Sequence, residues 1–469
     1  MRFLTIVYRE VGLQHLVSSS SPRDLFILIA SRFIRLLGFG AVAPILVIFL
    51  QEQLGFSKSR VGLFLSLTLF GDVTLSLLIS WVADSFGRRR VLALGSVLMA
   101  ISGIVFTVSS NYVVLLVSAI LGVISPSGNE CGPFSSIEVT MIADLVPPTD
   151  RVYVLAWYQI FGFIGLAFGS VLSGSIISKL ELERTTLESY RAIFALYSVL
   201  AVIKIALCIS LSSLSEGASA ESKKTELCRD GGEVEPELAE TAEDCERLPL
   251  LANANPKPPR ARDDIKIPIR PKRDSTQESS DCPLGRLGFT CLLFSIDSFA
   301  SSLIPASYVS LYLKSVFVAS IATITKVLAA SALGAVLTSL CAGALSKRAG
   351  VVFAMTSFHI PAQFMTAAMA IAPNIETGSA LYIARTCFSS LDSSVRGAFL
   401  SAMVPATSRT RFLAVNDVCR QLAAGLGPFV TGRLVKIDRL PLAFVISGAI
   451  KILADIGLLL GFSATKFEH

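Results

Sequence analysis

Charged residues and the usual signatures of catalysis are scarce in this chain. Only 16% of its 469 residues are charged and 52% are hydrophobic, whereas a soluble globular protein carries about 25% charged residues. The three histidines, His15, His359 and His469, are too scattered for a metal cluster. No P-loop or G-x-S-x-G motif occurs, which argues against an ATP-driven pump or a membrane hydrolase. We therefore expect a membrane protein that is not an enzyme and needs no metal or cofactor.

Cysteine pairs and basic stripes are also missing. The nine cysteines form no C-x-x-C pair and most lie in apolar runs, which favours small buried hydrophobic residues over a disulfide or metal site. The net charge is only +6, and the basic clusters adjoin apolar stretches, where anionic lipid explains them better than nucleic acid. The apolar run Phe3–Val7 is too short for a cleaved signal peptide. The expected partners are the lipid bilayer and a small solute, not nucleic acid.

The apolar residues are gathered into stretches long enough to cross a membrane, which takes about 20 residues in a helix. Ser21 as N-cap, Pro22 and Asp24 mark the start of the first stretch. The predicted spans lie at about 23–50, 58–83, 90–109, 112–145, 151–178, 190–213, 285–313, 317–345, 350–371, 377–405, 411–433 and 440–463. This pattern predicts an all-α integral membrane protein with 12 transmembrane helices.

A long polar segment divides these spans into two sets of six. It is acidic first, then rich in proline and basic residues, and this composition cannot bury enough apolar surface to fold. Its basic half could contact anionic lipid, although a plain solvated linker explains it equally well. Counting Lys and Arg in the tail and the linker places both in the cytoplasm. The predicted division is a tail at 1–22, an N-terminal bundle at 23–213, a linker at 214–284, a C-terminal bundle at 285–463 and a tail at 464–469.

The two halves repeat one another. A shift of 258 residues places "VPPTDRVYVLA" (146–156) on "VPATSRTRFLA" (404–414). Glycines coincide as well: Gly169 falls on Gly427 and Gly174 on Gly432, and a shift of 263 places Gly71 on Gly334 and Gly87 on Gly350. Internal repeats in a chain with many spans are typical of alternating-access transporters, whose site lies between the repeats.

One loop carries a recognisable motif. The segment "ISWVADSFGRRRVLALG" (79–95) sets an aspartate and three arginines between the second and third spans. It resembles the loop between spans two and three of the major facilitator superfamily, roughly Gly-x-Leu-Ala-Asp-Arg-x-Gly-Arg-Arg. Asp84, Gly87, Arg88 and Arg89 match that motif, and a degenerate copy, "GALSKRAG", follows at 343–350. The resemblance covers the chain from about Asp24 to Phe462. Within the superfamily, the sequence is similar to an uncharacterised fungal branch.

The resemblance implies a fold of two pseudo-symmetric six-helix bundles and a monomeric secondary active transporter, coupled to protons, in the plasma or vacuolar membrane. The alternative is a transporter-like nutrient receptor or scaffold that signals through the linker. It also implies that Asp84 latches against the start of span eleven, and the spacing of the motif favours this latch over the alternative that the loop is only a topology signal. Asp72 is a structural member of the same motif. Span five lacks the Gly-Pro pair of drug antiporters, because Ser170 follows Gly169.

Ionisable residues inside spans mark the candidate site, because each costs about 2.5–3.5 kcal/mol on insertion scales. In the resembled fold, spans one, four, seven and ten line the cavity. Arg32 and Arg35 lie on one helical face, which suits a carboxylate or phosphate, while Glu130 and Asp297 could pair with them or carry a proton. The candidates for the cavity are Arg32, Arg35, Glu130, Asp297, Arg385 and Asp392.

The repeat also places Glu138 on Arg396, so equivalent helices carry opposite charges. We hypothesise that these two residues meet as a cytoplasmic gate; the alternative is that each pairs within its own half, Arg396 with Asp392 for example. Two further sets are interpreted as local helix pairs: Asp417 with Arg420, three residues apart in the eleventh span, and Lys451 with Asp455, four residues apart in the last span.

Overall fold

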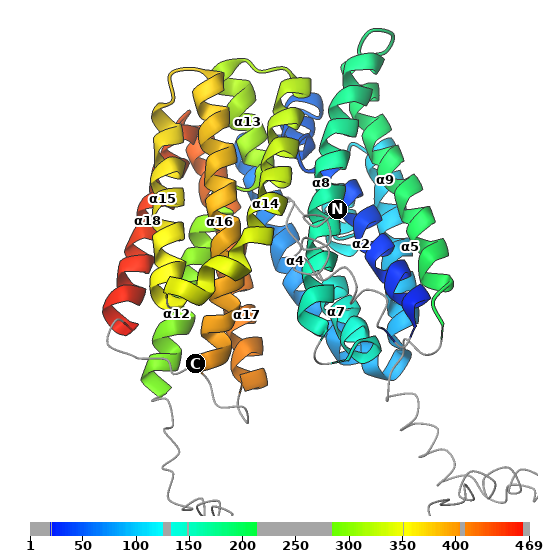
Figure 1. Ribbon diagram of the computed structural model, residues 1–469. Coiled ribbons are helices and arrows are strands. Elements are labelled where there is room, and N and C mark those ends of the chain that lie inside the picture. Colours follow the sequence, from blue (N-terminus) through cyan, green and yellow to red (C-terminus); the bar gives the residue numbers. More distant parts are fainter. Residues whose placement is uncertain are drawn as a thin grey trace, which may run out of the picture. The chain divides into compact units, whose positions relative to one another are not determined.

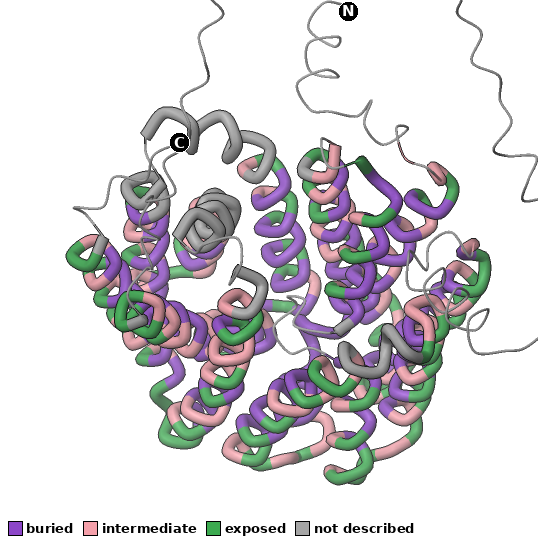
Figure 2. Tube along the Cα trace, turned by 90° about the horizontal axis from the view of Figure 1, so that it is seen from below, coloured by how far each residue is buried: buried purple, intermediate pink, exposed green. Residues whose placement is uncertain are grey.

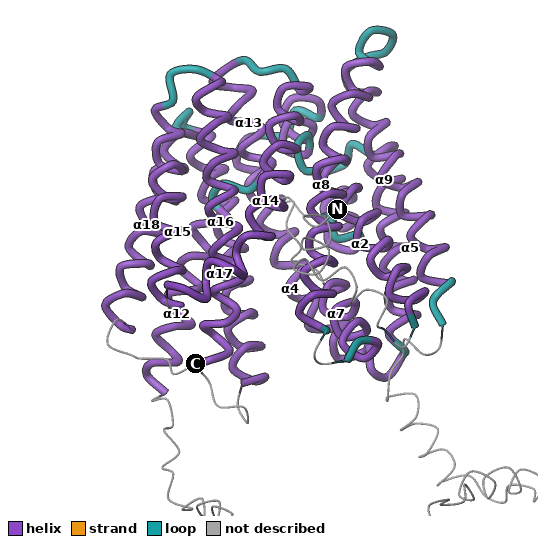
Figure 3. Tube along the Cα trace, viewed as in Figure 1, coloured by secondary structure: helices purple, strands orange, loops and turns teal. Residues whose placement is uncertain are grey.

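The computed structural model describes residues 19, 21–124, 133–147, 150–212, 284–349, 351–403 and 409–462. Side chains are not described at 80–85, 133, 152, 284, 339–349, 351–355, 391–403, 409–411 and 462. In these ranges every regular element is a helix (Figure 3), and both halves belong to one compact unit. The predicted linker lies outside the described residues, except for Leu284, where the first helix of the second half begins.

The N-terminal half consists of long helices that lie side by side (Figure 1). Their bounds are α2 Pro22–Val42, α3 Leu46–Ile48, the π-helical η2 Phe49–Gln53, α4 Lys58–Phe86, α5 Arg88–Val108, α6 Tyr112–Leu121, α7 Pro133–Leu145, α8 Arg151–Leu180 and α9 Thr186–Ile209. The predicted first span therefore continues through α2, α3 and η2, and the fourth span falls on α6 and α7.

The C-terminal half has the same arrangement. Its helices are α12 Leu284–Ser302, α13 Ala306–Phe317, α14 Ile321–Ala349, α15 Val351–Ala368, η5 Met369–Ile371, α16 Ile375–Met403, α17 Arg409–Lys436 and α18 Leu440–Phe462. In the residues that the structure describes, each predicted span thus falls mainly on helix, and eight of the described helices are long and apolar enough to cross a membrane. The all-α membrane fold expected from the sequence is confirmed.

The outer faces of the helices are apolar, as a lipid environment requires. On α5 the exposed residues Leu94, Ile101, Ile104 and Val108 form one stripe, with spacings of seven, three and four residues that keep them on one helical face. Seen from below, exposed positions lie mainly around the outside of the ring of helices and buried positions face inward (Figure 2). Apolar side chains on the outer surface are stable in contact with lipid but would be unfavourable in contact with water.

Local signals set the helix ends, with one departure from expectation. Ser21 is at the N-cap of α2 but makes no side-chain capping bond. Instead, Asp24 accepts a hydrogen bond from the backbone N–H of Ser212 at 3.1 Å and another from its hydroxyl. The start of α2 is therefore tied to the residues that follow α9, so the first and last helices of the N-terminal half are joined at one end.

Glycines that coincide in the sequence repeat occupy equivalent helix crossings. Gly169 on α8 packs against the Leu37 carbonyl of α2, and Gly427 on α17 packs against Ser302 at the end of α12. A Cβ atom at either position would collide with its neighbour, so only glycine lets these helices approach so closely. The repeat detected in the sequence is therefore a repeat of helix packing.

A second pair of equivalent contacts joins the two halves. Gly432 on α17 lies against Gly62 on α4, and Gly174 on α8 lies against Thr325 on α14. Because Gly62 and Thr325 also coincide under the 263-residue shift, the two crossings are related by the pseudo-symmetry. Both lie at the end of the unit opposite the attachment points of the linker, as the chain direction in Figure 1 shows.

Two ion pairs join the halves at that same end. Lys58 Nζ lies 2.5 Å from Asp438 Oδ1, and Lys314 Nζ lies 2.5 Å from Glu52 Oε2. Both pairs are partly exposed, so each contributes little on its own. Together with the glycine crossings they hold the end opposite the linker closed in this conformation, and α4 with α17 and α8 with α14 form the seams between the halves.

Candidate functional site

A cavity of about 400 Å³ lies between the two halves, within the size range of small-molecule sites. The N-terminal half contributes residues of α2, α4 and α8, and the C-terminal half contributes residues of α12, α14, α16, α17 and α18. Because both repeats wall the cavity, a relative movement of the halves would change its shape and its access.

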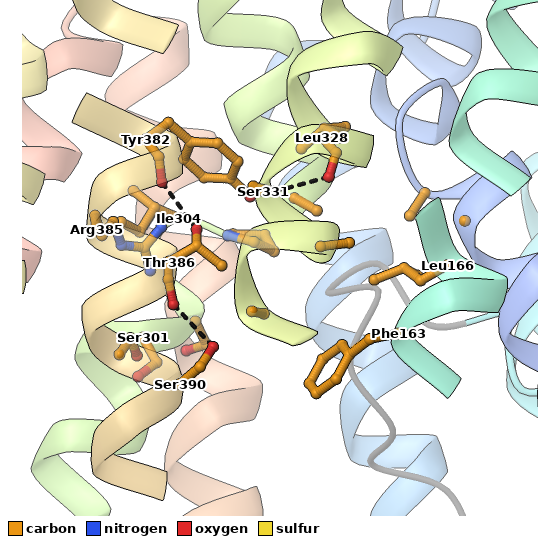
Figure 4. A pocket seen from close by; sticks show the side chains of 18 of the residues that line it. Phe163, Leu166, Ser301, Ile304, Leu328, Ser331, Tyr382, Arg385, Thr386 and Ser390 are labelled. Atoms are coloured by element: carbon orange, nitrogen blue, oxygen red, sulfur yellow. Dashed lines mark hydrogen bonds between the residues drawn. The ribbon is translucent and has the colours of Figure 1, made fainter. Parts of the chain in front are cut away.

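The two walls differ in chemistry. The N-terminal wall is mainly apolar and includes Leu69, Phe163 and Leu166. The C-terminal wall carries hydroxyl groups and three cations, from Ser298, Ser301, Ser302, Ser331, Tyr382, Arg385, Thr386, Ser389, Ser390, Arg420 and Lys451. Figure 4 shows Tyr382, Arg385, Thr386 and Ser390 along α16 on one side, with Phe163 and Leu166 on the opposite side.

Most of the wall hydroxyls are already bonded to their own helices. Thr386 donates to the Tyr382 carbonyl at 2.9 Å, Ser390 to the Thr386 carbonyl at 2.8 Å, and Ser331 to the Leu328 carbonyl at 2.8 Å (Figure 4). Their hydrogens are thus satisfied without a ligand, while the oxygen lone pairs still face a solute as acceptors. The wall is polar but stable when the cavity is empty.

Buried ionisable residues form a cluster behind this wall. The Nδ1 atom of His359 on α15 lies 2.8 Å from Asp455 Oδ2 on α18, and its Nε2 atom lies 3.7 Å from Asp297 Oδ1 on α12. Lys451 Nζ on α18 also lies 3.7 Å from Asp297 Oδ1. All four residues are more than nine-tenths buried. One histidine therefore bridges two carboxylates, and Lys451 connects the cluster to the cavity.

The interpretation of Lys451 and Asp455 as a local pair missed this arrangement, since both reach across to other helices. Sequence reasoning also discarded His359 because it treated the three histidines only as metal ligands. The available signal was the position of His359 inside a predicted span, where an ionisable residue is expensive and points to function.

A second buried cluster lies within the N-terminal half. Glu138 on α7 accepts hydrogen bonds from Arg35 on α2 and from the hydroxyl of Tyr158 on α8, both at 2.6 Å, and from Ser31 at 3.3 Å. Lys204 on α9 lies 4.0 Å from the same carboxylate. These contacts tie four helices of one half together, so the cluster braces the bundle.

Comparisons with known proteins agree with this geometry. Residues 28–278 match the sequence profile of the Major Facilitator Superfamily. An uncharacterised membrane protein of Saccharomyces cerevisiae is 31% identical over 93% of both chains. The chain belongs to the Major Facilitator Superfamily. It is accordingly a multi-pass membrane protein and a secondary transporter, not an enzyme.

Solved structures share the superfamily fold. A structure of proton-dependent oligopeptide transporters covers 94% of this chain and 99% of its own, with a TM-score of 0.67 and 14% identity. The inward-open xylose transporter from E. coli covers 92% and 95%, with a TM-score of 0.63 and 16% identity. Among sequence relatives, the arabinose-proton symporter of Bacillus subtilis is 32% identical over 25% of each chain. At such low identity the structural neighbours establish the fold alone.

The superfamily loop adopts a defined geometry where its side chains are described. Gly87 has a φ of 97°, a conformation that suits glycine, and it precedes α5. Arg88 Nη1 lies 2.6 Å from Asp144 Oδ2, and Arg89 donates to the Ile209 carbonyl at 2.5 Å. The side chain of Asp84 lies outside the described residues, so its latch to span eleven stays a prediction. Asp72 is fully buried, and neither carboxylate oxygen has a hydrogen-bond partner among the described residues.

The cavity candidates are distributed over several environments. Arg385 lies in the described wall of the cavity. Arg32 and Arg35 lie instead inside the N-terminal half, where Arg32 donates to Gln159 at 2.5 Å and its guanidinium lies 4.0 Å from the centre of the Tyr158 ring. Asp297 lies behind the wall, in the His359 cluster. Glu130 and the side chain of Asp392 lie outside the described residues.

The proposed gate between Glu138 and Arg396 is described on one side only. Glu138 pairs within its own half in this conformation, as the local alternative expects, because Arg35 and Tyr158 surround its carboxylate. The side chain of Arg396 lies outside the described residues, so a meeting of the two residues in another conformation stays a prediction.

Proposed function

We propose that this chain is a proton-coupled secondary transporter that moves a small solute through the central cavity by alternating access. The cavity supports the proposal because both repeats line it and because the end opposite the linker is held closed by a few ion pairs and glycine contacts. Such contacts can separate when the halves rock, which would expose the cavity to the other side of the membrane.

The observation that carries proton coupling is the bridge formed by His359 between Asp297 and Asp455. With a neutral histidine, this group of four holds two carboxylates and one ammonium; with a charged histidine, its formal charge is zero. Gain or loss of one proton changes the charge of this buried group by one unit, and solute or water entering beside Lys451 changes its electrostatic surroundings. The cluster therefore has the means to take up a proton in one conformation and release it in another.

The charges around the histidine also explain the link to solute. Lys451 contacts Asp297 and lines the cavity. A proton held by the cluster weakens the attraction between Asp297 and Lys451, which leaves the ammonium available to a solute. Binding and protonation are thereby linked through one side chain, as coupling requires.

The test is solute-driven proton movement in liposomes that contain the purified full-length protein and a trapped pH dye. Addition of candidate metabolites to the wild-type protein should change the internal pH, and His359→Gln and Asp297→Asn should abolish that change. His469→Gln is the matched control and should behave as wild type. Solute uptake without proton movement in the wild type refutes coupling, and unchanged proton movement in both cluster variants refutes the role of the cluster.

A further inference from the structure

The charges on the wall of the cavity identify the class of solute. Among the described lining residues there are three cations, Arg385, Arg420 and Lys451, and no carboxylate. Lys451 has Asp297 as a partner at 3.7 Å, whereas neither arginine forms an ion pair with a described residue. Because cations in a membrane interior are costly unless they are paired, the wall requires negative charge from elsewhere.

The local geometry leaves Arg385 and Arg420 able to bind an anionic group. Arg420 uses its Nε–H to donate to Ser298 at 3.0 Å, which fixes the side chain and leaves its terminal nitrogens without a described partner. Arg385 lies with its guanidinium carbon 5.6 Å from the centre of the Tyr382 ring, and its buried Nε has no hydrogen-bond partner in the described part of the chain. Two guanidinium groups held in this way offer paired N–H donors that match a carboxylate or a phosphate.

The opposite wall adds the second part of the chemistry. Phe163 and Leu166 on α8 and Leu69 on α4 present apolar surface to the same cavity. Arg32 and Arg35, the arginines first expected to meet an anion, are engaged inside the N-terminal half. Recognition of charge therefore belongs to the C-terminal half and recognition of apolar surface to the N-terminal half.

We propose that the solute is an amphipathic organic anion, a carboxylate or phosphate monoester, whose charged group binds Arg385 and Arg420 and whose apolar part packs against Phe163 and Leu166. This inference rests on the proposed function, since it takes the central cavity as the transport site. It predicts that the anionic group is essential for binding and that the neutral body alone is not retained.

Matched pairs of small molecules test this directly. Thermal unfolding of the purified full-length protein in detergent is followed with phenylacetate against phenylacetamide, hexanoate against hexanamide, and benzyl phosphate against benzyl alcohol. At least one acid should raise the unfolding temperature in a saturable way, while its neutral counterpart should not. Acids that all fail to stabilise the protein, or neutral counterparts that stabilise it equally, overturn the proposal.

Variants locate the site. Arg385→Gln and Arg420→Gln should each weaken binding of the stabilising acid about tenfold or more, since a charge-assisted hydrogen bond is lost. Arg433→Gln on α17 is the matched control, because Arg433 stacks on Phe429 and does not line the cavity. Arg385→Lys keeps the charge and should bind more weakly than wild type but more tightly than Arg385→Gln. Unchanged affinity in both glutamine variants, when they unfold as cooperatively as the control, refutes the assignment.

The result is separable from the test of the proposed function, because binding in detergent needs neither a membrane nor a proton gradient. An acid that binds through Arg385 but is never moved in liposomes would refute the proposed transport function and still support the anion-binding site. Conversely, a neutral solute that moves together with protons would overturn the anion site and leave proton-coupled transport intact.

Discussion

The contact between Gly432 and Gly62 offers a direct way to shift the conformation of the protein. A Cβ atom added at Gly432 would lie 2.6 Å from the Gly62 Cα and 3.2 Å from the Lys58 carbonyl oxygen. Carbon atoms pack at about 3.5–4.0 Å, so α17 and α4 must separate by about 1 Å to accept an alanine. Backbone atoms line the contact, and no side chain can rotate away to relieve the clash.

Overpacking of this kind costs about 1–3 kcal/mol. Because the contact exists only while the halves are closed at the end opposite the linker, Gly432→Ala should destabilise this conformation relative to the alternative by roughly that amount. Such an energy corresponds to a change of about 5- to 150-fold in the ratio of the two conformations. The free energy of unfolding of each half should change less, since the crossing joins the halves.

Distances between spin labels measure the shift. Leu182 and Val318 are highly exposed, 84% and 87%, and lie in loops at the closed end on different halves. Labels at these positions should give mainly a short distance in the parent protein and a longer component in Gly432→Ala. The control is Gly288→Ala, where an added Cβ meets nothing within 4 Å. Identical distance distributions in Gly432→Ala and in the control refute the assignment of this crossing as a closure contact.

Two further predictions concern buried carboxyl groups. Glu138→Gln should lower the free energy of unfolding by about 3–5 kcal/mol, because it leaves Arg35 buried without its counter-charge. Thermal unfolding in detergent measures this loss, and the double variant Arg35→Gln/Glu138→Gln should recover part of it. An unchanged melting temperature in Glu138→Gln contradicts the bracing role. Asp72→Asn should leave the melting temperature unchanged, because the fully buried carboxyl group makes no hydrogen bond to a described residue that the change would break, and the amide has nearly its shape. A large loss of stability in that variant would contradict this prediction and show that the carboxyl group makes an interaction that the amide cannot replace.

The spans and the repeat could be predicted from sequence because they depend on local properties. A helix in lipid must be apolar over its whole length, and glycines recur where helices cross. The pseudo-symmetry could therefore be detected in the sequence from the matching positions of Gly169 and Gly427. The family motif could also be recognised in the sequence, because its residues, such as Gly87 and Arg88, are adjacent in the chain.

The partners of the ionisable residues could not be predicted, because they depend on how each helix is rotated and on which helix packs against it. Lys451 and Asp455 stand four residues apart, which suggests a local pair, yet α18 directs them toward Asp297 and His359. Arg35 stands in a span expected to line the cavity, yet α2 packs so closely on α8 that its guanidinium meets Glu138 inside the half. Spacing along one helix says nothing of this rotation.

Uphill movement of solute tests the central claim most directly. Liposomes containing the full-length protein receive the acid that stabilises it best, with a proton gradient imposed across the membrane, and internal solute and internal pH are recorded together. The account predicts that solute accumulates above its external concentration while protons move with it, and that a protonophore or His359→Gln prevents the accumulation. Binding of the acid without any movement across the membrane would contradict the account and favour a receptor or scaffold.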